Sequence, residues 1–535
     1  MTEKIGNKAI TVAKGVRNIT IQGFINSLIG AILFLFISRS ISQEEMGLYG
    51  ALTLTVTIGI MLGILGLDYA ASRYISYLKG QNKHSQIKNI SKKILTVFFF
   101  SSIAITILFF FLSNEISLLL FDNNSYVLLI QFSSLTILPS VAGFVTLGFL
   151  QGFQTFSNIA LIKLLSGISR LITAILLINL GLGVLGLMAS WAISSFIIII
   201  FGIPIILKQI IKSNNSSMVE INDNSENPLS YRELFLFSFP MMGVYLFEHI
   251  LNAIDQYVVL AFLDLNSLGS YFVAATASTA IISILGAPLI MTLTPTISEV
   301  HGKIKLEGVS HSFKIASRYI SLFFTPATFL LAALSPVALY ILGGAKYYDA
   351  ILPLSIMSIG LMFYGLTVLF ISSLTAIAKT KIILLVLMLT AIVELISSII
   401  LTYLYGIQGA AFSRAITFIM MFVFAFSFAK KYFTVSIDKK IQINSILCSI
   451  IMSVIVYVIA FSTNFNIILL PVYLFLALII YSSTIILSKT IVHGDILFAI
   501  RLIPKNKFLY SKFKLFIQKS KLLYGLYMTF IGNNN

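Results

Sequence analysis

The chain has 535 residues, of which 58% are hydrophobic and only 10% are charged. Soluble globular proteins carry about 25% charged residues, so this composition excludes a soluble domain and predicts a protein that crosses a membrane many times. The single cysteine, Cys448, excludes an internal disulfide, a zinc finger and an iron–sulfur cluster. The formal net charge of +17 would suggest nucleic acid as a partner in a soluble protein, and here the positions of the charges decide otherwise.

Apolar runs of about 20 residues, bounded by polar clusters, predict membrane-spanning helices along the whole chain. Six runs precede a segment, residues 208–232, whose Ser, Asn and acidic residues predict a flexible cytoplasmic linker. Eight more runs follow that linker, so we expect an all-α polytopic membrane protein with about fourteen transmembrane helices. The runs lie near residues 18–38, 48–70, 94–113, 126–149, 158–179, 184–207, 235–261, 268–294, 319–342, 351–374, 382–404, 408–428, 443–462 and 467–488.

The positions of Lys and Arg test this map, because positive residues gather in the cytoplasmic connections of membrane proteins. Of the 36 Lys and Arg residues, 32 fall in the even-numbered connections and the two ends of the chain, when Lys163 near the start of the fifth span is counted with the connection before it. Only Arg39 and Lys346 lie in odd-numbered connections, and Arg170 and Arg414 lie inside predicted spans. We therefore predict a multi-pass protein of the cytoplasmic membrane with both termini in the cytoplasm, whose positive charge contacts anionic membrane lipids rather than nucleic acid.

An internal repeat divides the chain. Residues 46–49 read MGLY and residues 268–271 read LGSY, a separation of 222, and the Gly- and Ala-rich segments 183–189 and 406–412 are separated by 223. Six spans separate equivalent positions, so both copies have the same orientation in the membrane. We expect two six-helix lobes around a central cavity, which can rock between inward-open and outward-open states. The predicted units are an N-lobe (1–207), the linker (208–232), a C-lobe (233–430), two further helices (431–490) and a basic cytoplasmic tail (491–535).

Five short blocks of residues lie at or near the ends of predicted spans. They are Arg39, Glu44, Glu45, Gly47, Tyr49 and Gly50; Gly66, Leu67, Asp68, Tyr69, Arg73 and Tyr74; Phe237, Ser238, Phe239 and Pro240; Leu268, Gly269, Ser270 and Tyr271; and Tyr347, Leu352, Pro353 and Leu354. Together with the fourteen spans and two lobes, these blocks resemble the polysaccharide-type flippases of the MOP superfamily over nearly the whole chain.

The resemblance implies a transporter, not an enzyme, that translocates a polyprenyl-(pyro)phosphate-linked oligosaccharide across the cytoplasmic membrane without a cofactor. Two other branches export drugs in exchange for cations or flip the peptidoglycan precursor. The precursor branch is marked by a basic residue beside an acidic one in the first span, where this chain has Asn18, Gln22 and Asn26 instead. The alternatives that stay open are a cation-coupled drug exporter and, second, a membrane enzyme acting on lipid-linked glycan. We expect a monomer, since two lobes already form a complete pathway.

Polar groups inside predicted spans are the candidate site residues, because a charge at mid-bilayer costs about 2.5 to 3.5 kcal/mol and needs a partner or a wet cavity. Lys163 and Arg170 share one helical face of the fifth span. The planar guanidinium of Arg170 suits the pyrophosphate of a lipid-linked sugar. The candidate substrate-binding residues are Arg170, Lys163, Asn26, Gln22 and Arg414.

Three carboxylates inside spans are candidates for coupling transport to protons or sodium: Glu248, Glu394 and Asp255. By the repeat offset, Glu248 corresponds to Asn26, and Glu394 corresponds to Arg170. Arg170 therefore either faces the cavity or pairs with Glu394 or Glu248 as a contact between helices. The spacing of the five histidines predicts no metal site.

Overall fold

The fold is a bundle of long helices, seen here in a computed structural model. The structure describes residues 23, 25–81, 84–217, 230–377, 379–488 and 490, and every regular element in these residues is helical. A helix at Ile25–Ser40 comes first. The elements that follow are α2 (Gln43–Ile64), α3 (Leu67–Gly80), α4 (His84–Phe111), α5 (Ser113–Phe121), η1 (Asn124–Tyr126), α6 (Val127–Ser134), α7 (Ile137–Gly152), α8 (Phe156–Asn179), α9 (Gly183–Ser217), α10 (Tyr231–Phe262), α11 (Leu265–Ile281), η2 (Ile282–Gly286), α12 (Ala287–Ala333), α13 (Ser335–Gly343), η3 (Ala345–Ala350), α14 (Ile351–Ala376), α15 (Thr380–Ala429), α16 (Lys439–Ser462), η4 (Ile467–Leu469) and α17 (Leu470–Leu487).

Helices coincide with the predicted apolar runs, which confirms the all-α polytopic class. Eleven segments of the described chain are long and apolar enough to cross a membrane. One of them, α15, has 50 residues and would be about 75 Å long if it were straight, more than twice the thickness of a bilayer core. It bends back at Gly406, whose φ of 60° is accessible to glycine without strain, and so supplies both the eleventh and the twelfth predicted span.

The boundary between the lobes differs from the prediction. Helix α9 continues to Ser217, although the predicted linker begins at residue 208. The segment 205–211 reads IILKQII. Its apolar residues keep helical spacing beyond residue 207, where the sixth predicted span ends. Residues 218–229 lie outside the described residues, as do Gln22 and the predicted tail beyond residue 490.

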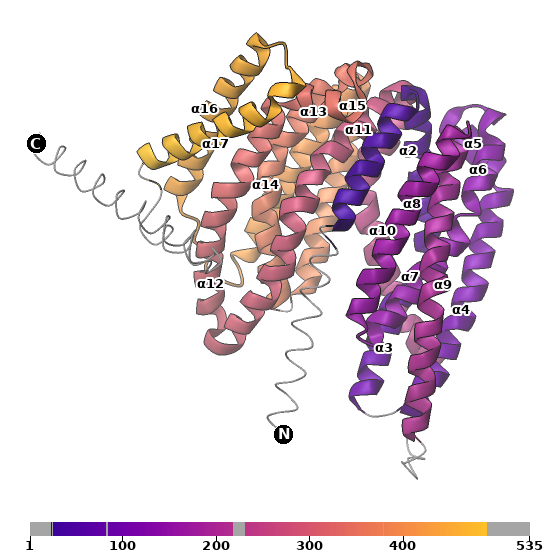
Figure 1. The fold of residues 1–535 in the computed structure, drawn as a ribbon. Helices are drawn as coiled ribbons and strands as arrows, with labels where there is room; N and C mark the ends of the chain where they lie inside the picture. The colour runs from indigo at the N-terminus through magenta and orange to yellow at the C-terminus, as the bar shows by residue number, and fades with distance from the viewer. Residues whose placement is uncertain are drawn as a thin grey trace, which may run out of the picture.

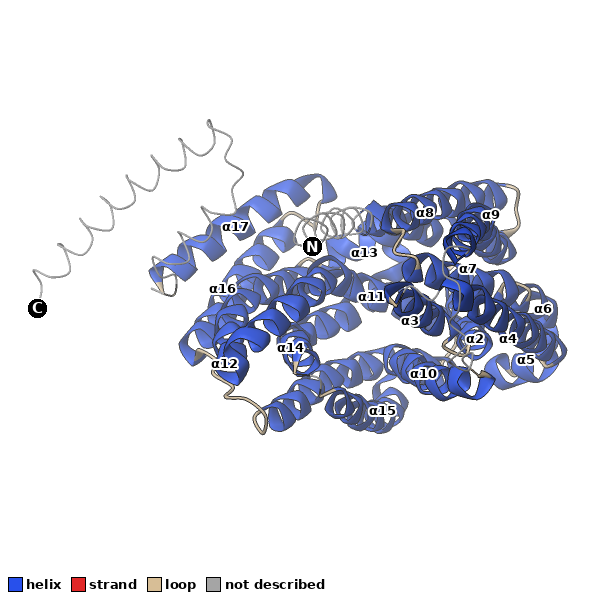
Figure 2. Ribbon diagram, turned by 90° about the horizontal axis from the view of Figure 1, so that it is seen from below, coloured by secondary structure: helices blue, strands red, loops and turns tan. Residues whose placement is uncertain are grey.

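The two halves of the chain form two helical groups that lie side by side (Figure 1), with α2 to α9 in one group and α10 to α15 in the other. The view in Figure 2 shows α16 and α17 at the outer edge of the second group, where α16 packs against α12. The main contact between the groups is made by α2 and α11, and α10 also packs against α2. We call the groups the N-lobe and the C-lobe.

The contact between α2 and α11 follows the internal repeat. A Cβ atom added to Gly47 would collide with the carbonyl oxygen of Leu265, and one added to Gly269 would collide with the carbonyl oxygen of Gln43. Gln43 and Leu265 are separated by the same 222 residues as Gly47 and Gly269. Each lobe therefore presents the same surface to the other, as in a two-fold symmetric interface. The repeated glycines are needed because the two backbones touch there.

Replacing Gly47 with Ala is expected to destabilise the protein by about 1–3 kcal/mol, the usual cost of forcing extra volume into a packed interface. The added methyl group meets backbone of the other lobe, which cannot rotate away. Gly30→Ala is the matched control, because a Cβ there meets nothing within 4 Å. Thermal unfolding of the purified protein in detergent measures both variants, and equal unfolding temperatures for the two would contradict the close contact.

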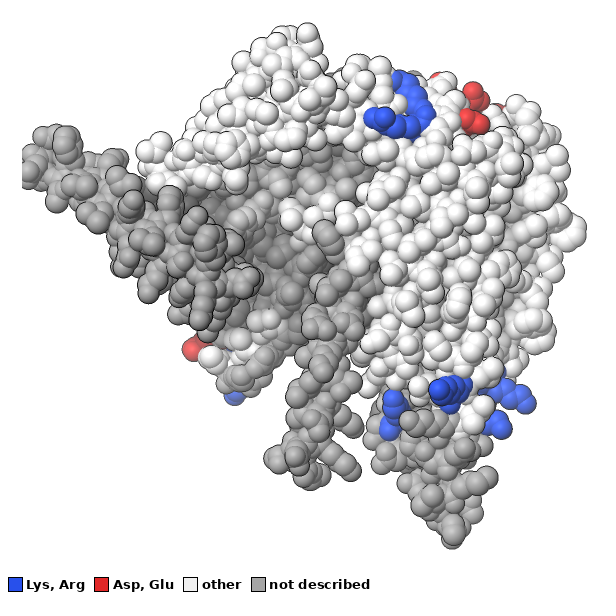
Figure 3. All heavy atoms as spheres, viewed as in Figure 1, with Lys and Arg blue, Asp and Glu red and all other residues white. Residues whose placement is uncertain are grey.

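The two ends of the bundle differ in charge. Lys and Arg gather at one end, at the lower edge of Figure 3, and a smaller group of basic and acidic residues lies at the opposite end. We define the basic end as the one where α3 ends and α4 and α10 begin, with Lys79, Lys88, Lys92 and Arg232 near those helix ends. Between the ends, many large apolar side chains are exposed, which is expected where a protein contacts lipid rather than water.

Candidate functional site

In the N-lobe, the guanidinium of Arg170 lies among aromatic side chains. Its Nη2 donates a hydrogen bond to the Tyr49 hydroxyl at 3.2 Å, and its Cζ lies 5.1 Å from the centre of the Trp191 ring. Helices α8, α2 and α9 supply Arg170, Tyr49 and Trp191, which we call the aromatic cluster. Among the described side chains, no carboxylate lies within ion-pair distance of Arg170. A guanidinium held by a ring face and one hydroxyl keeps most of its donors for another acceptor.

Two further candidates lie on the helices beside this cluster. Asn26 packs against α8 at Gly167, and its Oδ1 is buried without a hydrogen-bond partner in the described structure. Lys163 lies two turns before Arg170 on α8 and is half-buried. Between them, Ser166 donates a hydrogen bond to the carbonyl of Ser194 at 2.8 Å, which ties this face of α8 to α9.

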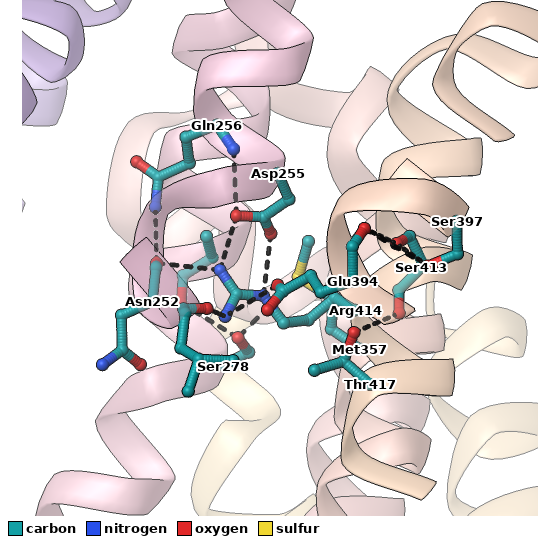
Figure 4. A network of polar contacts seen from close by, with 12 residues as sticks. Asn252, Asp255, Gln256, Ser278, Met357, Glu394, Ser397, Ser413, Arg414 and Thr417 are labelled. Carbon is teal, nitrogen blue, oxygen red and sulfur yellow. Dashed lines mark hydrogen bonds and ion pairs between the residues drawn. The ribbon is translucent and has the colours of Figure 1, made fainter. Parts of the chain in front are cut away.

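In the C-lobe, the guanidinium of Arg414 is surrounded by acceptors (Figure 4). It makes two parallel bonds to the carboxylate of Asp255, at 2.7 Å from Nε and 2.6 Å from Nη2. Nη2 also reaches the carbonyl of Asn252 at 2.9 Å, and Nη1 lies 3.5 Å from Oε1 of Glu394. The hydroxyl of Tyr271 donates to the same carboxylate of Asp255. We call Asp255, Tyr271, Glu394 and Arg414 the ion cluster.

The ion cluster is buried and its formal charges do not balance. Asp255, Glu394 and Tyr271 are fully buried, and Arg414 is 6% exposed. One guanidinium faces two carboxylates, so the cluster carries one excess negative charge when both are ionised. Neither oxygen of Glu394 accepts a hydrogen bond from the described residues. A buried charge without full compensation is costly, and Glu394 is the carboxylate of this cluster with the fewest contacts.

The two clusters occupy equivalent places in the two lobes. The repeat offsets of 222 to 224 relate Tyr49 to Tyr271, Arg170 to Glu394 and Trp191 to Arg414. Both tyrosines follow the touching glycines of α2 and α11 by two residues, so the clusters flank the contact between the lobes. Equivalent positions of the two lobes thus hold an arginine on an aromatic face in the N-lobe and a set of ionisable side chains in the C-lobe.

The structure brings together only some of the predicted site residues. Glu394 pairs with Arg414 rather than with Arg170. Asp255 is buried against Arg414, and the side chain of Glu248 lies outside the described residues. Sequence reasoning did not assign a site role to Tyr271 or to Trp191, the only tryptophan of the chain. Trp191 could have been found from the repeat, because it precedes the predicted site residue Arg414 by 223 residues.

A separate pocket of about 980 Å³ lies in the C-lobe, at the bend of α12 and the ends of α14 and α15. Its lining includes His301, Lys305, Lys379 and Tyr432, and Lys379 lies 5.0 Å from the ring centre of Tyr432. No predicted site residue lines this pocket.

Comparison with known proteins identifies the family. Residues 12–301, more than half of the chain, match the family described as polysaccharide biosynthesis protein. The chain belongs to this family. An uncharacterized membrane protein of Methanocaldococcus jannaschii is 24% identical over 431 residues, which cover 78% of this chain and 84% of that protein.

Solved structures of transporters share the fold. The lipid II flippase MurJ in an inward closed conformation superposes with a TM-score of 0.65 at 18% identity, over 88% of this chain and 98% of that chain. An inward-facing multidrug resistance MATE family transporter of the MOP superfamily gives 0.62 at 15% identity, over 78% and 97%. A MOP superfamily transporter from Pyrococcus furiosus, whose binding pocket is described as reversed in polarity, gives 0.55 at 14% identity, over 78% and 95%. These likenesses show that the chain shares the fold of these transporters.

Proposed function

We propose that this protein translocates a polyprenyl-(pyro)phosphate-linked oligosaccharide across the cytoplasmic membrane by alternating access, for the assembly of a surface glycan. The observation that carries the proposal is Arg170, a guanidinium inside the bilayer region whose described contacts are a hydroxyl and a ring face. Membership of the polysaccharide biosynthesis protein family and a fold shared with a lipid II flippase support the same cargo class.

The chemistry of the aromatic cluster suits an anionic head that carries sugars. A guanidinium presents a planar fork that binds two phosphate oxygens at once, and an arginine packed on an aromatic ring holds that fork in one orientation. Lys163 and Asn26 lie on the helices beside it and add a second positive charge and an amide. In contrast, Arg414 is occupied by Asp255 and by carbonyls of α10, so we assign substrate contact to Arg170 and not to Arg414.

We also propose that the ion cluster couples transport to a proton or sodium gradient. Both carboxylate oxygens of Asp255 are occupied by Arg414, so we assign the exchangeable ion to Glu394. Because α10 supplies Asp255 and α15 supplies Glu394 and Arg414, the bound ion affects how these two C-lobe helices pack. The other carboxylate predicted for this role, Glu248, stays a candidate by its position on α10.

The proposed orientation follows from charge. Positive residues are retained on the cytoplasmic side during insertion, so the basic end faces the cytoplasm and its lysines contact anionic lipid headgroups. The contact between α2 and α11 completes a two-lobe unit, which supports a functional monomer.

Depleting the protein in its host tests the function. We expect a polyprenyl-linked oligosaccharide to accumulate in extracted lipids, with its sugars on the cytoplasmic leaflet, while surface glycan falls. Mass spectrometry of the accumulated lipid then identifies the cargo. Unchanged lipid pools together with increased retention of cationic dyes would contradict the proposal and indicate a drug exporter, the other function found on this fold. Accumulation of an incomplete glycan would instead indicate an enzyme.

A further inference from the structure

The two cations that depart from the positive-inside pattern, Arg39 and Lys346, lie in contact with the opposite lobe. Lys and Arg are normally retained on the cytoplasmic side of a membrane. A positive residue on the opposite side is therefore expected to have a structural role there. Arg39 lies at the end of the helix Ile25–Ser40, in the N-lobe, and Lys346 lies in η3 of the C-lobe. Both are at the end of the bundle opposite the basic end.

Arg39 binds the last turn of a C-lobe helix. Its Nε donates to the carbonyl of Ile341 at 2.9 Å, and its Nη2 donates to the carbonyl of Tyr340 at 3.2 Å. Helix α13 ends at Gly343, so these carbonyls belong to its last turn, where donors within the helix run out. The carbonyl of Tyr340 also accepts from the backbone N–H of Gly344 at 3.0 Å. The negative end of the helix dipole lies there as well, which favours a cation.

Lys346 makes the converse contact. Its Nζ donates to the carbonyl of Ile41 at 2.5 Å, just past the C-terminal end of the N-lobe helix that carries Arg39. The next residue, Tyr347, is fully buried, and its hydroxyl donates to the carbonyl of Ser38 at 3.3 Å. Each lobe therefore uses its cation to cap a helix end of the other lobe. We call Arg39, Lys346 and the three carbonyls that they bind the latch.

Further hydrogen bonds extend the interface between the lobes at this end, which we call the seam, toward the touching glycines. Ser38 donates to the carbonyl of Leu342, and Asp349 accepts from Ser270 at 2.8 Å and from Gln43 at 3.2 Å. The seam thus joins the lobes from the first helix to α11. Charge-assisted bonds are about twice as strong as neutral ones, so Arg39 and Lys346, together with the Asp349 carboxylate, supply the largest polar contributions to it.

We infer that the latch holds this end of the transport pathway shut, and that both of its cations must release before the pathway opens there. This inference rests on the proposed alternating-access function. Arg39 is exposed, so water can hydrate the guanidinium and the freed carbonyls when the lobes separate. The exchange of protein bonds for water bonds makes the latch reversible, whereas a buried ion pair would have to be broken without compensation.

Cysteine labelling tests the latch without any substrate. Ile41 is 4% exposed inside the closed seam, and only its backbone carbonyl takes part in the latch. We would place Ile41→Cys in a Cys448→Ala background and measure its reaction with a membrane-impermeant maleimide in right-side-out vesicles. The double substitution Arg39→Met with Lys346→Met is expected to raise the labelling rate about tenfold or more, since each bond to a charged group contributes to closure. Each single substitution is expected to give a smaller increase.

Control variants separate the latch from a general effect of charge. Lys381→Met removes an exposed lysine at the basic end and should leave the rate at the parent value. Arg39→Lys keeps a donor and should restore most of the closure. A double variant that labels at the parent rate, or a Lys381→Met variant that labels as fast as the double variant, would overturn the inference. If the double variant does not reach the membrane, the two single variants carry the same test. Because labelling needs no cargo, this result is independent of the lipid accumulation experiment.

Discussion

Replacing Arg170 with Gln is expected to lower the transport rate by about ten- to a hundredfold, with unchanged abundance in the membrane. The substitution removes a hydrogen bond to a charged group, which typically contributes about 1.5–3 kcal/mol, and each 1.4 kcal/mol is a factor of ten. Restoration of surface glycan in depleted cells measures the effect, and so does the flipping of the accumulated lipid in proteoliposomes.

Two variants separate substrate binding from a structural role of Arg170. Tyr49→Phe removes the hydroxyl that accepts from Arg170 but leaves the guanidinium on the Trp191 ring, so we expect nearly normal transport. Arg170→Lys keeps the charge and loses the planar fork, so its rate should fall between those of the parent and the Gln variant. If Tyr49→Phe is as damaging as Arg170→Gln, the hydrogen bond between the two helices is the function of Arg170. Full transport activity of the Arg170→Gln variant would show that Arg170 does not bind the substrate.

Replacing Arg414 with Met is expected to destabilise the protein by about 3–5 kcal/mol, the cost of leaving a buried charge without its partner. The variant leaves two fully buried carboxylates facing each other, Asp255 and Glu394, and also frees the carbonyls of Leu251 and Asn252. Thermal unfolding in detergent and abundance in the membrane measure the loss.

A second variant of the ion cluster, Glu394→Gln, provides the comparison for Arg414→Met. Glu394→Gln removes the excess negative charge and keeps the volume, so stability should be retained while the dependence of transport on the ion gradient is lost. Arg232→Met, at an exposed arginine of the basic end, controls for the loss of a positive charge and should unfold at the parent temperature. Equal unfolding temperatures for Arg414→Met and Arg232→Met would contradict the buried pairing of Arg414 with Asp255.

Much of the fold could be predicted because its signals are local. A run of about 20 apolar residues buries its backbone polar groups within one helix, so each span is readable without knowledge of its neighbours. The bias of Lys and Arg set the expected orientation in the same local way. The repeated Gly47 and Gly269 are a longer-range signal, yet they are readable because both lobes place a glycine where their backbones touch.

The partners of the intramembrane charges could not be predicted from helical spacing. Asp255 and Arg414 are 159 residues apart and lie on α10 and α15, and which helix faces meet depends on how all the helices pack. The repeat offset related Glu394 to Arg170 but carried no information on contact, since equivalent positions lie in different lobes. Gly406 likewise turned two predicted spans into one bent helix through a single residue with positive φ.

The sequence by itself determined that this is an all-helical membrane protein, where its spans lie, and that it is built from two copies of one unit, because composition and periodicity act over tens of residues. Only the tertiary structure decided that Arg170 rests on Trp191, that Arg414 is occupied by Asp255 with Glu394 beside it, and that Arg39 and Lys346 cap helix ends across the lobes. These contacts join residues far apart in the chain, and a charge in a membrane is defined by the partner that packing brings to it.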